Sequence, residues 1–130
     1  MIDYLTIVYK NYDLLNLQLD NFKKRFSNKR YRLIVVDNTP DNEKQKIERS
    51  DEIDVTVELE SVPTFDGISH GGAIDVGLRY CESDIVCLFD SDFFFLHPDI
   101  DGYAKEKFKD GYSAVGCDWD DGDGTRSWSQ

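Results

Sequence analysis

The chain has 130 residues, and 15 Lys and Arg against 26 Asp and Glu give a formal net charge of −11 at pH 7. This length predicts one domain, and an apolar fraction of 40% is enough for a hydrophobic core. The acidic excess argues against nucleic acid and anionic membranes as partners, because their phosphates would be repelled. No apolar run reaches the ~18 residues that a membrane span requires.

The cysteines and the N-terminal residues bear on the cellular compartment. Cys81, Cys87 and Cys117 are odd in number and lack a C-x-x-C spacing, which predicts buried thiols in a reducing compartment. The first residues do not show the basic and then apolar pattern of a targeting segment. We therefore expect a cytoplasmic protein, and the sequence carries no signal for its oligomeric state.

The first half of the chain alternates short apolar runs with a segment of helical periodicity. Residues 4–9 and 33–37 are predicted strands, and the second is apolar at successive positions, as in a central strand covered on both faces. Thr39 and Pro40 predict the start of a short helix anchored by Ile47. A longer helix from about residue 13 shows an apolar stripe made of Leu15, Leu19, Phe22 and Phe26.

The second half continues this alternation. Residues 53–59 predict a half-exposed strand near the sheet edge, and residues 85–89 predict a buried central strand. Between them, Ser69 is expected to cap a helix whose small residues allow a close approach to a strand or ligand. Later elements are a helix from Pro98 to before Gly111, a strand at 112–117, and an acidic, solvated or frayed tail at 118–130.

These elements together predict an α/β fold with a mainly parallel, Rossmann-like sheet flanked by helices. The carboxyl ends of parallel strands share one edge, so Asp37 and Asp90, which each end a strand, should face one crevice. Residues 1–130 would then form a single domain with its site at this edge.

Asp90 and Asp92 form an Asp-x-Asp motif directly after the most apolar predicted strand. In an extended chain the two side chains point the same way with Cα atoms about 7 Å apart. Their charges then repel by roughly 2 kcal/mol at an effective dielectric constant of about 20. A divalent cation, Mg²⁺ or Mn²⁺, would turn this repulsion into attraction and bind phosphate oxygens. The alternative is a solvated turn, in which Asp is common.

Four segments in order carry a resemblance to a known family: residues 9–11, 35–38, 69–77 and 88–92. With them the chain resembles the nucleotide-binding half of a GT-A fold glycosyltransferase, similar to glycosyltransferase family 2, over residues 3–118. The fourth segment is the most specific. The resemblance implies a GT-A-like fold that is truncated at its C-terminus.

The resemblance also implies roles for individual residues. Asp37 matches the acid that hydrogen-bonds the base of the donor, and the turn from Tyr9 to Asn11 matches the backbone beside the nucleoside. Asp90 matches the acid near the ribose and the metal, and Asp92 matches the direct metal ligand. The expected nucleotide-binding residues are Tyr9, Asn11, Asp37, Asn38, His70, Asp90 and Ser91, and the expected metal ligands are Asp90 and Asp92.

His70 has two interpretations. At the start of a helix it can contact phosphate or ribose, because free backbone N–H groups there favour anions. It can equally be an exposed or capping histidine. Family members often carry an arginine–asparagine pair where this chain has Ile74 and Asp75, so donor binding is expected to rest more on His70 and the backbone.

We expect a glycosyltransferase that uses a nucleoside-diphosphate sugar, a divalent metal and a glycan or other hydroxyl acceptor. A general base for the acceptor hydroxyl is not identifiable. The acids far enough along the chain match no family motif; they are Asp118, Asp120, Asp121 and Asp123.

Two alternatives belong to other classes. One is a non-catalytic module that binds a nucleotide sugar and metal, which the unidentified base favours. The other is a haloacid-dehalogenase-like phosphotransferase, in which the first Asp of the motif is a nucleophile. The second is disfavoured because its motif usually lies on the first strand and carries threonine where this chain has Phe94.

Overall fold

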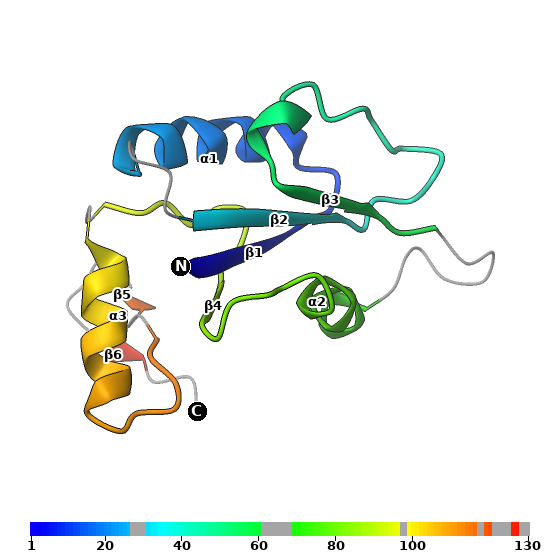
Figure 1. Ribbon diagram of the computed structural model, residues 1–130. Coiled ribbons are helices and arrows are strands. Elements are labelled where there is room, and N and C mark those ends of the chain that lie inside the picture. Colours follow the sequence, from blue (N-terminus) through cyan, green and yellow to red (C-terminus); the bar gives the residue numbers. More distant parts are fainter. Residues whose placement is uncertain (27–30, 61–68, 97–98, 117–118, 121–125, 128–130) are drawn as a thin grey trace. The chain divides into compact units, whose positions relative to one another are not determined.

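The computed structural model describes residues 1–26, 31–60, 69–96, 99–116, 119–120 and 126–127. The chain divides into two compact units, Met1–Pro98 and Asp99–Gln130. The first unit is an α/β structure, which confirms the predicted fold class (Figure 1). Its elements are β1 (Ile2–Val8), α1 (Tyr12–Arg25), β2 (Tyr31–Asp37), η1 (Ser50–Glu52), β3 (Val55–Glu58), α2 (His70–Leu78) and β4 (Val86–Leu88).

The four strands of this unit form a parallel sheet in the order β3-β2-β1-β4. Successive strands are added on one side of β1, as β2 and then β3, before β4 returns to its other side. The point between β1 and β4 is therefore a topological switch point, where open α/β sheets bind ligands beyond the carboxyl ends of the strands. The pairs Val8–Asp37 and Leu5–Leu88 set the register that brings these ends to one edge.

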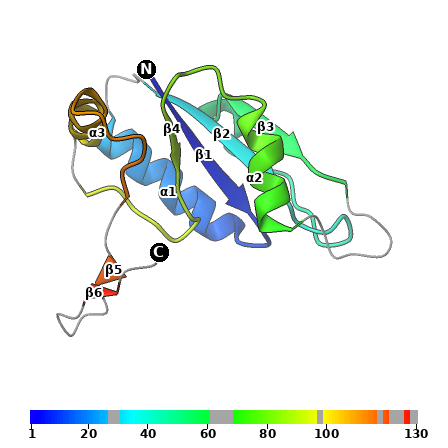
Figure 2. The same ribbon diagram turned by 90° about the horizontal axis from the view of Figure 1, so that it is seen from below.

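The two helices of the first unit cover opposite faces of the sheet (Figures 1 and 2). On one face, the predicted stripe of α1 is confirmed, since Leu15, Leu19 and Phe22 are buried. The ring of Phe22 meets that of Tyr4 edge-on at 5.2 Å, a favourable aromatic geometry. Helix α1 is thus held to β1 by packing in the core.

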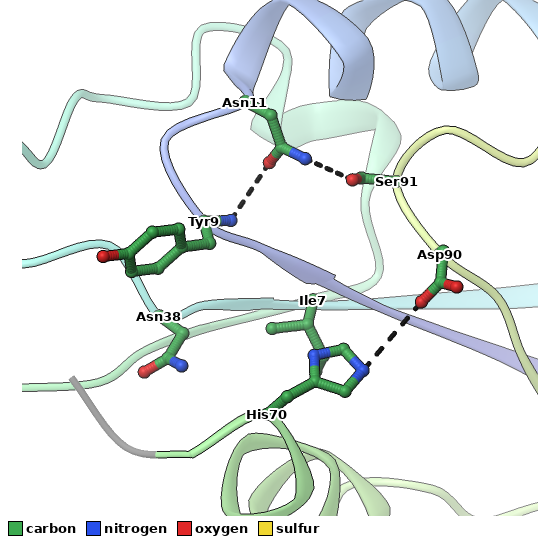
Figure 3. A pocket seen from close by; sticks show the side chains of 7 residues that line it. All are labelled: Ile7, Tyr9, Asn11, Asn38, His70, Asp90 and Ser91. Carbon is green, nitrogen blue, oxygen red and sulfur yellow. Dashed lines mark hydrogen bonds and ion pairs between the residues drawn. The ribbon is translucent and has the colours of Figure 1, made fainter.

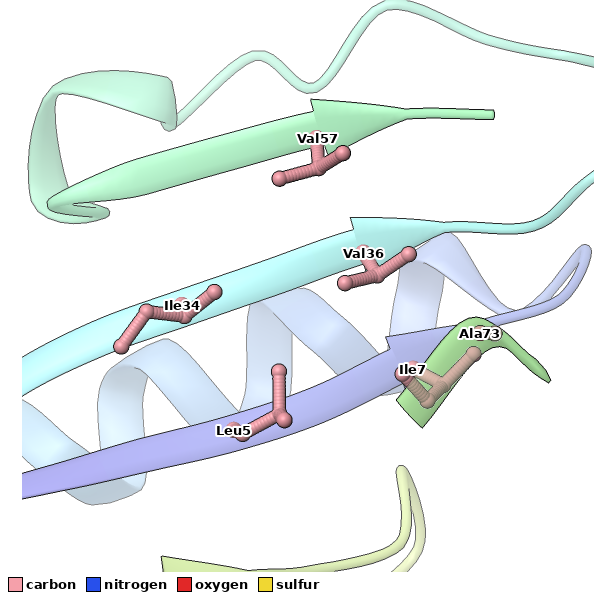
Figure 4. Packing of buried hydrophobic residues seen from close by; sticks show 6 residues of the cluster. All are labelled: Leu5, Ile7, Ile34, Val36, Val57 and Ala73. Atoms are coloured by element: carbon pink, nitrogen blue, oxygen red, sulfur yellow. The ribbon is translucent and has the colours of Figure 1, made fainter. Parts of the chain in front are cut away.

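On the other face, α2 packs closely on β1 and β2, as its small residues predict. The core cluster there consists of Leu5, Ile7, Ile34, Val36, Val57 and Ala73 (Figure 4). A Cβ atom at Gly77 would lie 2.5 Å from Leu5 Cδ1, so an alanine there would require the helix or the Leu5 side chain to shift. The predicted cap is confirmed as well, because the Ser69 hydroxyl accepts a hydrogen bond from Gly72 N at 3.2 Å.

A buried carboxylate, Asp3, anchors the connection between α2 and β4. Its Oδ2 accepts hydrogen bonds from the backbone N–H groups of Glu82 and Ser83, at 2.6 and 3.0 Å. Burial by itself would raise the pKa of Asp3, but these bonds, the Ser83 hydroxyl and the charge of Arg32 outweigh it and lower the pKa. The carboxylate therefore stays ionised inside the fold.

The helix predicted at Thr39 and Pro40 is wrong. Residues 38–49 are turns and irregular backbone, followed by the short helix η1. The Thr39 N–H donates to Asp37 Oδ1 at 3.0 Å, and its hydroxyl accepts from Lys10 N at 2.9 Å. Both groups are therefore bound to other partners and do not cap a helix, although Ile47 is buried as expected.

The outer strands give one correct and one wrong prediction. Strand β3 lies at the sheet edge and is half exposed, as its alternating pattern predicts. Strand β4 is not central in the described sheet, because it pairs with β1 on one side only, and Leu88 is 52% exposed. Apolar composition shows that a strand can be buried, but it does not set how many neighbours the strand has.

The second unit contains α3 (Ile100–Lys109) and two short strands, β5 (Trp119–Asp120) and β6 (Arg126–Ser127), which pair antiparallel. The Asp99 side chain caps α3 by accepting from Gly102 N, and Gly111 follows the helix with φ 94°, a conformation that favours glycine. The predicted strand at 112–117 is wrong, because residues 112–116 are exposed and form no strand. Pro98, Cys117 and much of the expected acidic tail lie outside the described residues.

Cys81 and Cys87 are free thiols, half-buried in the first unit. Burial raises the pKa of the Cys81 thiol, which favours its protonated form. Within the described ranges, no helix combines the length and the apolar character needed to cross a membrane.

Candidate functional site

The first part of the site is the turn between β1 and α1. Lys10 has φ 63°, a left-handed conformation that is unfavourable for a residue with a Cβ atom. Two hydrogen bonds hold the backbone there: Lys10 N donates to Thr39 Oγ1, and Tyr9 N donates to Asn11 Oδ1 at 3.0 Å. Strained backbone that its surroundings hold in place is frequent at functional sites.

The second part is the turn that contains the Asp-x-Asp motif. Phe93 N donates to Asp90 O at 3.0 Å, so residues 90–93 form a turn. The expectation of an extended motif with both side chains on one side is therefore wrong. The hydrogen bond that closes the turn replaces the strand geometry on which that expectation depended.

Two side chains of helix α1 hold this turn and the residues after it through hydrogen bonds to the backbone. Gln18, which is 2% exposed, donates from Nε2 to Asp90 O at 2.8 Å and to Phe93 O at 3.3 Å. Asn21 exchanges two hydrogen bonds with the backbone of Phe95. Sequence reasoning missed both residues. The available signal was the position of Gln18 on the apolar stripe, where a buried polar group requires a partner.

A side-chain hydrogen bond joins the two turns. Asn11 Nδ2 donates to Ser91 Oγ, while Asn11 Oδ1 accepts from Tyr9 N (Figure 3). One amide therefore bridges the carboxyl ends of β1 and β4, on the two sides of the switch point. This bridge brings together residues that are 80 positions apart in the sequence.

These turns surround a pocket of about 360 Å³, within the range of small-molecule sites. It lies at the carboxyl ends of β1, β2 and β4 and at the start of α2 (Figure 3). The structure brings together six of the residues expected from the sequence, and adds Ile7. The lining residues are Ile7, Tyr9, Asn11, Asn38, His70, Asp90 and Ser91.

His70 and Asp90 face each other in the pocket (Figure 3). His70 Nε2 lies 3.9 Å from Asp90 Oδ1, which is an ion pair when the imidazole is protonated but is too long for a hydrogen bond. Both side chains are exposed, by 64% and 77%. Among the lining residues His70 is the only one with a basic side chain, and it lies beside the Asp90 carboxylate.

Asp37 is placed differently from the other expected residues. It is fully buried and does not line the pocket, whereas its neighbour Asn38 does. Its Oδ2 accepts from the Tyr12 hydroxyl at 2.8 Å, and that hydroxyl accepts from Gln45 N at 3.0 Å. Its Oδ1 accepts from Thr39 N. Burial raises the pKa of Tyr12 and keeps it a hydrogen-bond donor.

Asp92 is exposed in the turn and is not a lining residue of the pocket. In the part of the chain that the structure describes, no three His, Cys, Asp or Glu side chains cluster in a way that could hold a metal. The candidate bases Asp118, Asp121 and Asp123 lie outside the described residues, as does the side chain of Asp120.

The fold and the pocket define an α/β protein with a polar pocket at the switch point of a parallel sheet. The model of Glycosyl transferase family 2 matches residues 5–129, and the chain belongs to this family. The match confirms the resemblance seen in the sequence and supports glycosyltransferase activity in general, against the phosphotransferase alternative. No curated protein sequence matches the chain.

Proposed function

We propose that this chain binds a nucleoside-diphosphate sugar in the pocket and transfers the sugar to an acceptor hydroxyl. The observation that carries the proposal is the Asn11–Ser91 bridge, which assembles a polar pocket at the switch point of a sheet in a glycosyltransferase-family chain. Open α/β sheets bind nucleotides at this place. The non-catalytic binding module remains as an outcome of the test below.

The lining residues suit successive parts of the donor. Tyr9 and Asn38 offer an aromatic ring and an amide to the nucleoside, and Asp90 and Ser91 offer acceptors to the ribose hydroxyls. His70 is the first residue of α2, where unpaired backbone N–H groups attract anions. The imidazole and this helix end would bind the diphosphate in a chain of charge −11.

The turn at residues 90–93 also suits a divalent cation. Asp90 and Asp92 are both exposed, and Mg²⁺ or Mn²⁺ commonly takes one or two carboxylates and fills its remaining positions with water and phosphate oxygens. A bound cation would supply Lewis-acid stabilisation of the departing nucleoside diphosphate. Gln18 holds the backbone of this turn through two hydrogen bonds, so the segment that carries the two carboxylates is fixed before the ligand binds.

Calorimetric titration of uridine, guanosine and thymidine diphosphates, with and without MnCl₂, tests the proposal. Asp90→Asn keeps the size of the side chain but removes its charge, and we expect it to weaken binding about tenfold or more, typical of a charged ligand contact. Asp84→Asn is the matched control, because Asp84 is exposed and does not line the pocket.

The outcomes separate the interpretations. Equal affinities of the two variants would remove Asp90 from the site, and no binding by the wild-type chain would refute the proposal. Binding without transfer or hydrolysis of a bound nucleotide sugar would select the non-catalytic module. Asp92→Ala reports on the metal: it should abolish the effect of MnCl₂ while leaving the unfolding transition unchanged.

A further inference from the structure

The side chain of Lys10 makes two contacts at the rim of the pocket that the proposed function does not use. Its Nζ lies 2.7 Å from Glu43 Oε2, in the loop after β2, and 5.1 Å from the centre of the Tyr9 ring. An ammonium group at this distance is attracted to the face of an aromatic ring. The hydrogen bond with Glu43 raises the pKa of Lys10, so the side chain keeps its charge.

The contact between Lys10 and Tyr9 goes together with an unfavourable backbone conformation. In an extended strand, neighbouring side chains point to opposite faces. At Lys10 the chain has left this geometry with φ 63°, and the hydrogen bond from Lys10 N to Thr39 Oγ1 holds it there. A conformation that is costly for a residue with a Cβ atom is thus kept where it accompanies an ammonium group beside the ring.

Tyr9 is the residue through which this contact reaches the pocket. Its ring lines the pocket, whereas Lys10 itself does not (Figure 3). Tyr9 is 44% exposed, so packing alone does not fix the orientation of the ring. The ammonium lies over the ring, and Glu43 holds the ammonium from another loop. A ring that is ordered before the ligand arrives loses less conformational freedom on binding.

We infer that Lys10 is a positioning residue that holds the Tyr9 ring for stacking on the base of the nucleotide, and that Glu43 in turn holds Lys10. The inference rests on the proposed function, because the ring belongs to the same pocket. Stacking on an aromatic ring is tolerant of the kind of base. Lys10 therefore affects how tightly the nucleoside is held and not which base is chosen.

Calorimetry with two ligands, both with MnCl₂, tests this inference. One ligand is the nucleoside diphosphate that the wild-type chain binds most tightly among the three named above. The other is ribose 5-diphosphate, which keeps the ribose and the phosphates but lacks the base. The ratio of the two dissociation constants reports the contribution of the base. If ribose 5-diphosphate binds too weakly to titrate, the affinity for the nucleotide alone is compared across the same variants.

The variants separate positioning from direct contact. Lys10→Met keeps a side chain of similar length without its charge, and Glu43→Gln weakens the hold on Lys10 at unchanged size. Tyr9→Leu removes the ring, and the double variant of Tyr9→Leu with Lys10→Met completes a cycle. Lys46→Met is the matched control, because Lys46 is an exposed residue of the same loop as Glu43 and does not line the pocket.

We expect Lys10→Met to weaken binding of the nucleotide about two- to fivefold, the size of an exposed cation–π contact, and to leave ribose 5-diphosphate unaffected. Glu43→Gln should shift the ratio in the same direction, and Lys46→Met should not shift it. Tyr9→Leu should weaken binding of the nucleotide about tenfold. In that background Lys10→Met should change nothing further, because a positioning residue acts through the group that it positions.

Three results would overturn the inference and leave the proposed function standing. One is a loss of affinity in Lys10→Met that is equal for both ligands, which would mean that Lys10 acts on the phosphates or on the fold. Another is an effect of Lys10→Met that persists when Tyr9 is already leucine. The third is a nucleotide affinity that Lys10→Met leaves unchanged. Failure of the wild-type chain to bind any of the nucleotides would overturn the proposed function and the inference together.

Discussion

The contact between α2 and the sheet makes Gly77→Ala a sharp test of the fold. An added Cβ atom would lie 2.5 and 2.9 Å from the two terminal carbons of Leu5 and 3.0 Å from Val36 Cγ2. Leu5 and Val36 are both buried, at 1% and 0% exposure, so any movement of these side chains must be accommodated by their neighbours in the core. Either the helix must move away from β1 or the core must rearrange.

The expected magnitude follows from two opposing effects. Overpacking a core costs about 1–3 kcal/mol, whereas replacing a helical glycine by alanine favours the helix by about 1 kcal/mol. We expect Gly77→Ala to lower the free energy of unfolding by up to about 2 kcal/mol relative to the wild-type chain. For a chain of this length, this corresponds to a decrease in Tm of up to about 8 °C.

Urea unfolding, followed by far-UV circular dichroism and by the near-UV signal of the tyrosines, measures this change. Gly71→Ala is the matched control, because it lies on the same helix and a Cβ atom there meets no atom within 4 Å. The control should be as stable as the wild-type chain or slightly more stable. If Gly77→Ala matched the control, the close approach of α2 to β1 would be refuted.

Three further perturbations test the other contacts. Asp3→Asn should lower the free energy of unfolding by about 2 kcal/mol at pH 7. Because the folded pKa of Asp3 is lowered, the stability that its carboxylate contributes is present above the unfolded pKa of about 3.9 and is lost as the pH falls through the folded pKa. The midpoint of urea unfolding, measured against pH, should therefore fall less steeply at acid pH in Asp3→Asn than in the wild-type chain. The same acid dependence in both chains would contradict this prediction. Gln18→Leu should weaken nucleotide binding in calorimetry by loosening the Asp-x-Asp turn; unaltered affinity would count against that role. Arg49→Lys loses the two-pronged contact with Glu52 and should cost under about 1 kcal/mol, a difference that should shrink in 1 M NaCl.

Part of the site could be predicted from the sequence, because strand ends are visible in the pattern of apolar residues. Tyr9 ends a predicted strand and Asn38 and Asp90 each follow one, and parallel strands place such residues at one edge. Six of the expected residues line the pocket: five lie at or just after a strand end, and His70 lies at the start of α2. The motif of Asp90 and Asp92 also led to the family that the family model then confirmed.

The rest of the site depends on contacts that no local pattern contains. Asp37 and Asn38 come directly one after the other at the end of the same apolar run. The Tyr12 hydroxyl of α1, 25 positions away, donates a hydrogen bond to the Asp37 carboxylate, which is buried and does not line the pocket. Gln18 bonds to the backbone of Asp90, 72 positions away, and so supports the turn that the hydrogen bond from Phe93 N to Asp90 O closes. Neither partner can be identified from residues nearby in the sequence.

By itself the sequence determined the α/β class, the buried stripe of α1, the cap of α2 and the edge position of β3, since each follows from the local alternation of apolar and polar residues. The tertiary structure decided that β4 has a single described neighbour, that Thr39 holds the turn at Lys10 instead of starting a helix, and that His70 meets Asp90. The physical reason is that the interacting residues are far apart along the chain. Each outcome depends on which remote residue bonds to a polar group or covers an apolar face, and only the folded chain brings these residues together.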